Sequence, residues 1–206
     1  MASTFPRDSK SLLIIFYRNP EPGKVKTRLA STLGETKALS VYLYLSAHTK
    51  TITQNLKADK VVFYSDYIQD DDQWNSSIYQ KQIQSGVDLG TRMSNAFRYG
   101  FTSGYHSIVI IGTDCLELTP SLIEDAFNKL KSCDTVIGPA KDGGYYLLGM
   151  KMLHEDFFNN KLWSTTSIYE TTVADFKSLG LHYEVLPVLS DIDEAADIPF
   201  DLNKIL

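Results

Sequence analysis

The chain has 206 residues, 43% of them hydrophobic and 22% charged, a balance typical of a globular protein that buries its own core. Its formal net charge of -5 provides no general basic surface, which argues against a nucleic-acid partner. No apolar run is long enough for a membrane span, and residues 1–10 lack the apolar core of a signal peptide. Cys115 and Cys133 match no metal-ligand spacing, and so few cysteines are typical of a reducing compartment. We therefore expect one cytoplasmic domain over residues 1–206, with 1–10 flexible.

The first candidate site is a basic loop. An apolar run over residues 12–17 predicts a strand, and the two prolines and one glycine of residues 18–23 exclude both helix and strand after it. Three cations then occur within five residues, at Lys24, Lys26 and Arg28. Phosphoryl oxygens need several fixed donors, so this loop is a candidate phosphate site, with a solvated basic turn as the alternative. Its glycine spacing matches neither a P-loop nor a Rossmann fingerprint.

The middle of the chain alternates between helical and strand patterns: a helix over residues 35–56, a strand over 60–65 and a short strand over 78–84. The acidic run Asp70-Asp71-Asp72 is expected to be a solvated face rather than a metal site. A helix with one apolar face is predicted to begin after Gly86, and Arg92 lies in its first turn, where the helix dipole disfavours a cation. Arg92 is therefore either a ligand contact or the partner of a surface carboxylate.

The central strand is predicted over residues 107–111, a mostly β-branched run typical of a strand buried on both faces. It ends at Gly112, and Asp114 follows two residues later. Ligands of open α/β sheets bind beyond the carboxyl ends of the strands, so Asp114 is a candidate for holding a divalent cation. The alternative is that Asp114 caps the turn before the next helix, for which Thr119 and Pro120 predict the N-cap and the first helical position.

Two further strands are predicted over residues 134–139 and 145–149, and Asp142-Gly143-Gly144 lies between them. This segment is either a hairpin turn, since Asp-Gly supplies positive φ angles, or a place where the two glycines leave room for a ligand beside Asp142.

A helix over residues 168–179 and a last strand over 182–189 precede Asp191 and Asp193. Alternate positions of an extended chain point to the same side, so this pair could complete a metal site begun by Asp114. The two carboxylates could equally serve as the N-cap and first-turn acid of a terminal helix. The alternation of strands and helices along the whole chain predicts an α/β fold, a three-layer sandwich with a mostly parallel central sheet.

Taken together, several segments resemble a bacterial family of glycosyltransferase-like proteins that have the glycosyltransferase-A, or nucleotide-diphospho-sugar transferase, fold. The segments are Lys24–Leu29, Gln84–Met93, Gly112–Asp114, Gly138–Tyr145 and Asp191–Asp193. The resemblance runs from Leu12 to about Asp197. Relatives by fold include the enzymes that guanylate phospholactate and the molybdenum cofactor.

The resemblance implies a metal-dependent transferase that acts on a nucleotide-activated donor and a small-molecule acceptor. It implies that Asp114 holds Mg²⁺ or Mn²⁺ and that Asp191 supplies a further metal ligand. By the same analogy Asp142 lies on the acceptor side with Gly143 and Gly144. Asp114 and Asp142 are therefore the catalytic candidates.

The resemblance also implies that Lys24 and Arg28 hold phosphates, and Lys26 and Arg92 complete the expected nucleotide contacts. Glycosyl transfer from a nucleotide sugar is the first expectation for the reaction. Glycosyltransferases of this fold usually carry two aspartates one residue apart, whereas a cysteine follows the metal-binding candidate here. A nucleotidyltransferase that uses a nucleoside triphosphate and a non-catalytic nucleotide-binding module therefore stay open as alternatives.

Overall fold

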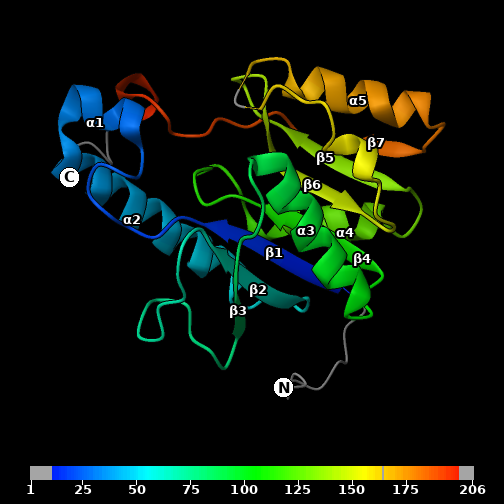
Figure 1. The fold of residues 1–206 in the computed structure, drawn as a ribbon, viewed down its shortest axis with the longest axis horizontal. Helices are drawn as coiled ribbons and strands as arrows, with labels where there is room; N and C mark the ends of the chain where they lie inside the picture. Colours follow the sequence, from blue (N-terminus) through cyan, green and yellow to red (C-terminus); the bar gives the residue numbers. More distant parts are fainter. Residues whose placement is uncertain (1–10, 164, 200–206) are drawn as a thin grey trace.

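The computed structural model describes residues 11–163 and 165–199, and the expectation for residues 1–10 lies outside this part of the chain. Seven strands form one sheet in the order β3-β2-β1-β4-β6-β5-β7 (Figure 1). The strands are β1 Ser11–Tyr17, β2 Asp59–Tyr64, β3 Tyr79–Ile83, β4 Ser107–Ile111, β5 Thr135–Pro139, β6 Tyr145–Met150 and β7 Tyr183–Val185. The helices are α1 Thr27–Leu33, α2 Glu35–Thr53, α3 Leu89–Thr102, α4 Pro120–Lys129 and α5 Ile168–Ser178, with short 3₁₀ turns η1 Glu155–Phe157 and η2 Ala195–Asp197.

The sheet is parallel except for β6, which runs antiparallel to both β4 and β5. Because β4 and β5 share this antiparallel neighbour, they are parallel to each other. The carboxyl ends of six strands therefore lie at one edge of the sheet. This arrangement confirms the predicted α/β fold with a mostly parallel sheet, and it places the loops after β1, β4 and β5 on the same side of the molecule.

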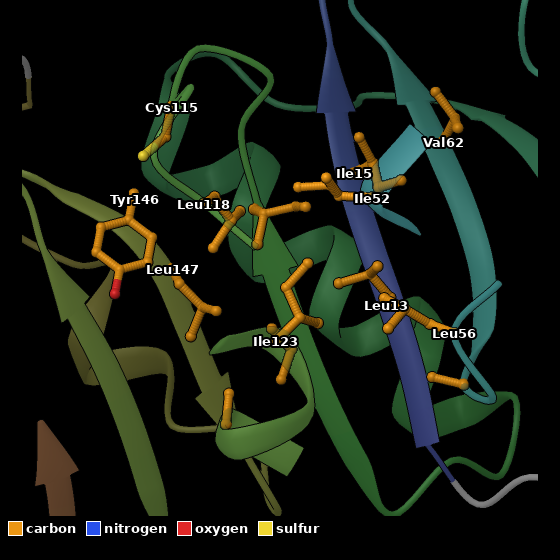
Figure 2. Close-up of a cluster of buried hydrophobic side chains, with 14 of the residues drawn as sticks. Leu13, Ile15, Ile52, Leu56, Val62, Cys115, Leu118, Ile123, Tyr146 and Leu147 are labelled. Carbon is orange, nitrogen blue, oxygen red and sulfur yellow. The ribbon is translucent and has the colours of Figure 1, made fainter. Parts of the chain in front are cut away.

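Helices cover both faces of the sheet, as a three-layer sandwich requires. Alternate residues of β1 point to opposite faces, with Leu13 and Ile15 on one and Leu12 and Ile14 on the other. The first pair packs in a cluster with side chains of α2 and α4, part of which Figure 2 shows. The second pair packs with side chains of α3 and α5. This double burial explains why β1 reads as a continuous apolar run.

The structure differs from the prediction at both ends of the chain. The helix α1 follows the basic loop and was not expected. The last strand is shorter than residues 182–189, because the chain after Val185 leaves the regular ladder and touches β5 only at intervals, for example where Leu189 N donates to Pro139 O. No regular terminal helix follows in the described residues, where η2 has Glu194 as its N-cap instead of Asp191 or Asp193.

The expectation for the acidic run is wrong for Asp72. Its side chain is only 7% exposed and pairs with Lys81 of β3, whose Nζ lies 2.9 Å away. The hydroxyl of Tyr64 also donates to the Asp72 carboxylate. Asp70 and Asp71 are exposed, as predicted. Separately, none of the helices in the described part of the chain has the length and apolarity of a membrane span.

Candidate functional site

Three loops that are far apart in the sequence meet beyond the carboxyl edge of the sheet. The loop after β1 carries Lys26, the loop after β4 carries Asp114, and the segment after β7 carries Asp191 and Asp193. Ile192 holds the third loop in place, because its N–H donates to Asp114 O at 3.0 Å and its side chain is buried among residues of α1 and α2. In Figure 1 this segment crosses from β7 to α1. The convergence is what a parallel sheet predicts for a ligand site.

Lys26 lies at the centre of this meeting point. Its side chain is 6% exposed, and its Nζ lies 3.3 Å from Asp114 Oδ2 and 3.2 Å from Asp193 Oδ1. Burial alone lowers the pKa of Lys26, but the two carboxylates together raise it above its ordinary value, so the lysine stays charged. Its backbone is left-handed, with φ 47° and ψ 50°, an unfavourable conformation for a residue other than glycine. Such strain is common at functional sites, where the surrounding structure holds it.

Asp114 is held at the site and not at a helix terminus. The N-cap of α4 is Thr119, as predicted, and its side chain accepts from Leu122 N. The Asp114 carboxylate folds back over Gly112, where a Cβ would lie 2.7 Å from Oδ1. A side chain at position 112 would therefore displace the Asp114 carboxylate. The Asp114 side chain remains 42% exposed, which leaves it accessible to a ligand.

Asp191 adds negative charge that the site does not fully neutralise. Burial, together with the charges of Asp114 and Asp142, raises its pKa to about 6. The same neighbourhood includes Cys115, a free thiol whose pKa burial raises to about 12 and whose Sγ lies 3.7 Å from Ser190 O. The thiol is therefore protonated and unsuited to nucleophilic attack.

The carboxylates fit a divalent cation that arrives with its substrate. No group of three or more histidine, cysteine, aspartate or glutamate side chains in the described residues could enclose a metal ion. Mg²⁺ in nucleotide enzymes is usually held by one or two carboxylates together with substrate phosphates. Asp114 and Asp191 offer hard oxygen donors, and burial together with the charges of Asp114 and Asp142 raises the pKa of Asp191. These two carboxylates are the residues that could hold Mg²⁺ or Mn²⁺ at an open site, and their metal-ligand role stays a prediction.

The other predicted phosphate ligands of the basic loop are more exposed than Lys26. Arg28 is 60% exposed, and its Nη1 lies 3.0 Å from Asp193 Oδ2, at the outer side of the same carboxylate. Lys24 is 69% exposed and pairs with Glu21 at 2.7 Å, away from the acidic group. The structure thus brings Lys26 and Arg28 to one carboxylate and leaves Lys24 in a separate surface pair.

Arg92 braces the loop between β3 and α3. Its Nε donates to Gly86 O at 3.1 Å, and its Nη1 lies 3.4 Å from Gln84 Oε1. No carboxylate in the described parts of the chain is within ion-pair distance of it, so the alternative of a surface ion pair is wrong. The charge of Arg92 has no counter-charge there, and its role in nucleotide binding stays a prediction.

The turn between β5 and β6 is a tight turn and leaves no ligand space at Gly143. Asp142 Oδ1 accepts from Gly144 N at 2.8 Å, and Gly143 has φ 90°. A Cβ on Gly143 would lie 1.9 Å from Thr166 O, because the chain before α5 passes directly over it. Thr166 therefore fills the space over Gly143, whereas the expected room beside Asp142 stays a prediction. Asp142 itself is exposed, and its acceptor-side role, like that of both glycines, stays a prediction.

Two residues matter more in the structure than the sequence suggested. Asp193 forms ion pairs with both Lys26 and Arg28. The family resemblance had implied a site role only for Asp191, two residues earlier. Asn19 is buried directly after β1, where its Oδ1 accepts from Asp66 N and its Nδ2 donates to Tyr67 O. It ties the loop after β1 to the loop after β2. In the sequence, the only signal for this role was an asparagine between an arginine and a proline, and that pattern is equally typical of a turn.

The fold is that of the nucleotide-diphospho-sugar transferases. A structure from Desulfovibrio desulfuricans G20, provisionally named a nucleotide-diphospho-sugar transferase, is 33% identical to this chain, with a TM-score of 0.83 over 90% of this chain and 83% of that one. Two structures share the fold at much lower identity. The 4-diphosphocytidyl-2C-methyl-D-erythritol synthase of Anaerococcus prevotii DSM 20548 is 10% identical (TM-score 0.60; 96% and 98% covered). The inositol-1-phosphate CTP transferase of T. maritima is 13% identical (TM-score 0.51; 98% and 96% covered).

The chain belongs to the family described as "Uncharacterized protein conserved in bacteria (DUF2064)", whose sequence pattern matches residues 48–165. The matched region includes Asp114 and Asp142, whereas Lys26 and Asp191 lie outside it. No curated protein matches the sequence of this chain. The resemblance to a bacterial glycosyltransferase-like family with this fold is thereby confirmed.

Proposed function

We propose that this protein is a metal-dependent transferase that uses a nucleotide-activated donor, and that its reaction is glycosyl transfer from a nucleotide sugar. The observation that carries the proposal is the meeting of buried Lys26 with Asp114 and Asp193 from three loops at the carboxyl edge of the sheet. The likeness to the 33% identical protein of Desulfovibrio desulfuricans G20 supports the sugar donor.

The donor diphosphate binds between the basic loop and the carboxylates. Lys26 Nζ has three protons and only two acceptors in the described residues, so one N–H is available for a phosphate oxygen. Because its ion pairs already fix Lys26, it stabilises the leaving diphosphate without reorganising. Arg28, at the exposed side, adds a planar fork that matches phosphate oxygens.

Asp114 and Asp191 are the residues that would hold the metal. When bound, Mg²⁺ or Mn²⁺ neutralises charge on the diphosphate and so makes it a better leaving group. The two carboxylates orient that positive charge toward the site, and the shortage of positive charge around Asp191 favours its binding.

Asp142 is the candidate general base for the acceptor. Its charge acts on Asp191, which places it at the same edge of the sheet, and its side chain is exposed. In the transfer, the acceptor oxygen forms a bond to the anomeric carbon while the bond from that carbon to the diphosphate oxygen breaks. The acceptor proton passes to Asp142, and the nucleoside diphosphate leaves with the bonding electron pair. No covalent intermediate with the protein is required.

Nucleotidyl transfer is the second candidate, and one observation favours it. Where glycosyltransferases of this fold usually carry two aspartates one residue apart, Asp114 is followed here by Cys115 and Leu116, and the Cys115 thiol is directed to Ser190 O. The fold is also shared with enzymes named as a CTP transferase and a diphosphocytidyl synthase. In that reaction the acceptor attacks the α-phosphorus of a nucleoside triphosphate, and pyrophosphate leaves.

The two reactions are separated by their products. The protein is incubated with Mg²⁺ or Mn²⁺ and panels of nucleotide sugars and nucleoside triphosphates, with water as the acceptor in the first screen. Release of nucleoside diphosphate from a sugar donor is the expected result, and it must disappear in Asp114→Asn but persist in the matched surface variant Asp70→Asn. Release of pyrophosphate from a triphosphate would instead establish nucleotidyl transfer. Nucleotide binding without turnover across both panels, repeated with sugar and alcohol acceptors, would overturn both reactions in favour of a binding module.

A further inference from the structure

The outer face of α5 forms a surface groove with the last strand of the sheet. The residues of α5 that face the core are Ile168, Thr172 and Phe176, and all three are buried. The next face of the helix and the outermost strand β7 together line a groove of about 380 Å³, which we call the α5–β7 groove. Its apolar lining residues are Tyr169, Val173, Ala174, Tyr183 and Val185. The groove lies on the opposite face of the sheet from α2 and α4, and its Tyr169 end adjoins the turn between β5 and β6, where Tyr169 N donates to Gly143 O at 2.9 Å.

Two opposite charges flank the apolar centre of the groove. Glu170 and Lys177 both line it, and they are seven residues apart on α5, which is about two helical turns or about 10 Å. Both side chains are exposed, and neither has an ion-pair partner in the described part of the chain. Val173 lies midway between them, and Ala174 beside it is small enough for another helix to approach closely. The surface thus has an acidic end, an apolar middle and a basic end.

The neighbouring strand is open as well. β7 is the last strand on its side of the sheet, and Val185 is 41% exposed. The one charged residue of this strand, Glu184, is paired with Lys129 at 3.2 Å. Proteins commonly prevent unwanted pairing at an edge strand by placing a free charge on it. The charge of Glu184 is already neutralised by its ion pair, so β7 lacks this protection.

We propose that the α5–β7 groove binds a second copy of this chain across a two-fold axis that passes near Val173. A two-fold axis sets the two α5 helices antiparallel, so the acidic end of each meets the basic end of the other. Glu170 then lies opposite Lys177 of the second copy, and this contact occurs twice. The same contact between the two copies buries the apolar centre of the groove, which is formed by Val173, Tyr169 and Val185. A surface that is complementary to itself in this way fits an identical partner better than an unrelated one.

Charge reversal tests the pairing directly. The mass of the wild-type protein is measured by light scattering after size exclusion over a range of concentrations, and a concentration-dependent dimer is expected. Glu170→Lys and Lys177→Glu each place like charges opposite one another at both contacts, so each is expected to weaken the dimer at least about tenfold. An equimolar mixture of the two variants is expected to form a mixed dimer, since one then carries only basic groups and the other only acidic groups.

A spin label locates the axis. Both native cysteines are buried, so Val173→Cys supplies a specific labelling site. The expected result is a short distance between the two labels, one that is absent for Leu43→Cys, which is exposed on α2 at the other face of the sheet. The proposal is overturned if the wild type remains monomeric up to about 1 mM. It is equally overturned if a dimer forms but both charge reversals leave it unchanged, because the chain then associates through another surface.

Discussion

Among the buried lysines that pair with aspartates in the described residues, Lys26 and Lys81 differ in how completely their hydrogen bonds are satisfied. Their side chains are similarly enclosed, at 6% exposure for Lys26 and 7% for Lys81. Lys81 Nζ has three acceptors, Gln69 O at 2.6 Å, Asp70 O at 3.1 Å and Asp72 Oδ1 at 2.9 Å, one for each proton. Lys26 has two, both beyond 3 Å, and no third in the described residues.

The aspartate partners of the two lysines also differ in how completely they are enclosed and hydrogen-bonded. Asp72 is enclosed, and besides Lys81 it accepts from the Tyr64 hydroxyl and from Trp74 N, so nothing from outside is needed. Asp114 is partly exposed and lies in a group with more negative than positive charge. Buried polar groups that are fully bonded make a structure rigid, whereas incompletely bonded ones require an explanation such as a ligand. The comparison assigns Lys81 to stability and supports the proposed binding role of Lys26.

The largest effect is expected for the structural pair. Lys81→Met leaves Asp72 enclosed without its cation and should lower the free energy of unfolding by about 3–5 kcal/mol. Urea denaturation measures this loss, and donor turnover per folded molecule should not change. Arg98→Met, which breaks an ion pair that is 46% and 55% exposed, is the matched control and should cost no more than about 1 kcal/mol. Equal losses in the two variants would contradict the structural role of Lys81.

Lys26→Met should give the opposite pattern. Loss of a preorganised cation at the leaving diphosphate is expected to slow donor turnover by about 10²–10³-fold. The cost in stability should be smaller than for Lys81→Met, because Asp114 and Asp193 are 42% and 38% exposed and stay hydrated without the lysine. Steady-state kinetics measures the loss of turnover, and urea denaturation of the same preparation measures the loss of stability. Intact turnover combined with a large stability loss would show that Lys26 is structural after all.

Ligand binding should stabilise the site that is incompletely bonded. A nucleoside diphosphate with Mn²⁺, at about 100 times its dissociation constant, should raise the free energy of unfolding by about 2.7 kcal/mol, measured as a thermal shift. A chelator should reverse the part that depends on the metal. The shift should be lost in Asp114→Asn and kept in Asp70→Asn. A shift of unchanged size in Asp114→Asn would show that this carboxylate is not a metal ligand.

The smallest effect is a gain in stability. Burial and neighbouring charges raise the pKa of Asp191 from 3.8 to about 6, so its ionised form destabilises the folded state. Asp191→Asn should therefore stabilise the metal-free protein at neutral pH, by about 1 kcal/mol after solvent screening. The pKa of Asp191 is higher in the folded protein than in the unfolded chain, so its ionisation costs stability at high pH. The stability gained by Asp191→Asn is therefore full above about pH 6 and declines to nothing near pH 4. Denaturation at several pH values tests this, and a variant less stable than wild type at pH 7 would refute it.

The sequence predicted best those elements whose signals are local. The continuous apolar runs of β1 and β4 indicated directly that these strands are buried, and Thr119 with Pro120 marked the start of α4. Helix α1 was missed because it has seven residues and its N-cap, Lys26, makes no side-chain capping bond. A left-handed residue other than glycine leaves no local sequence signal.

The parts of the site that could not be predicted depend on contacts between distant residues. Lys26 and Asp193 are 167 positions apart, and no pattern within either loop indicates that they meet. The burial of Asp72 depends in the same way on Lys81 of the next strand, and within the acidic run it is indistinguishable from Asp70 and Asp71. The space over Gly143 is filled by Thr166, which comes from a distant segment that no turn rule describes.

The segment after β7 has a consequence for how the protein is made. It carries Asp191 and Asp193, and Ile192 fastens it to α1, α2 and the loop after β4. A ribosome that has released all seven strands has therefore not yet supplied Asp191 and Asp193, two of the three carboxylates around Lys26. The sheet can form during synthesis while the site is still incomplete. On the proposed function, nucleotide and metal bind in full only after the last part of this segment has emerged.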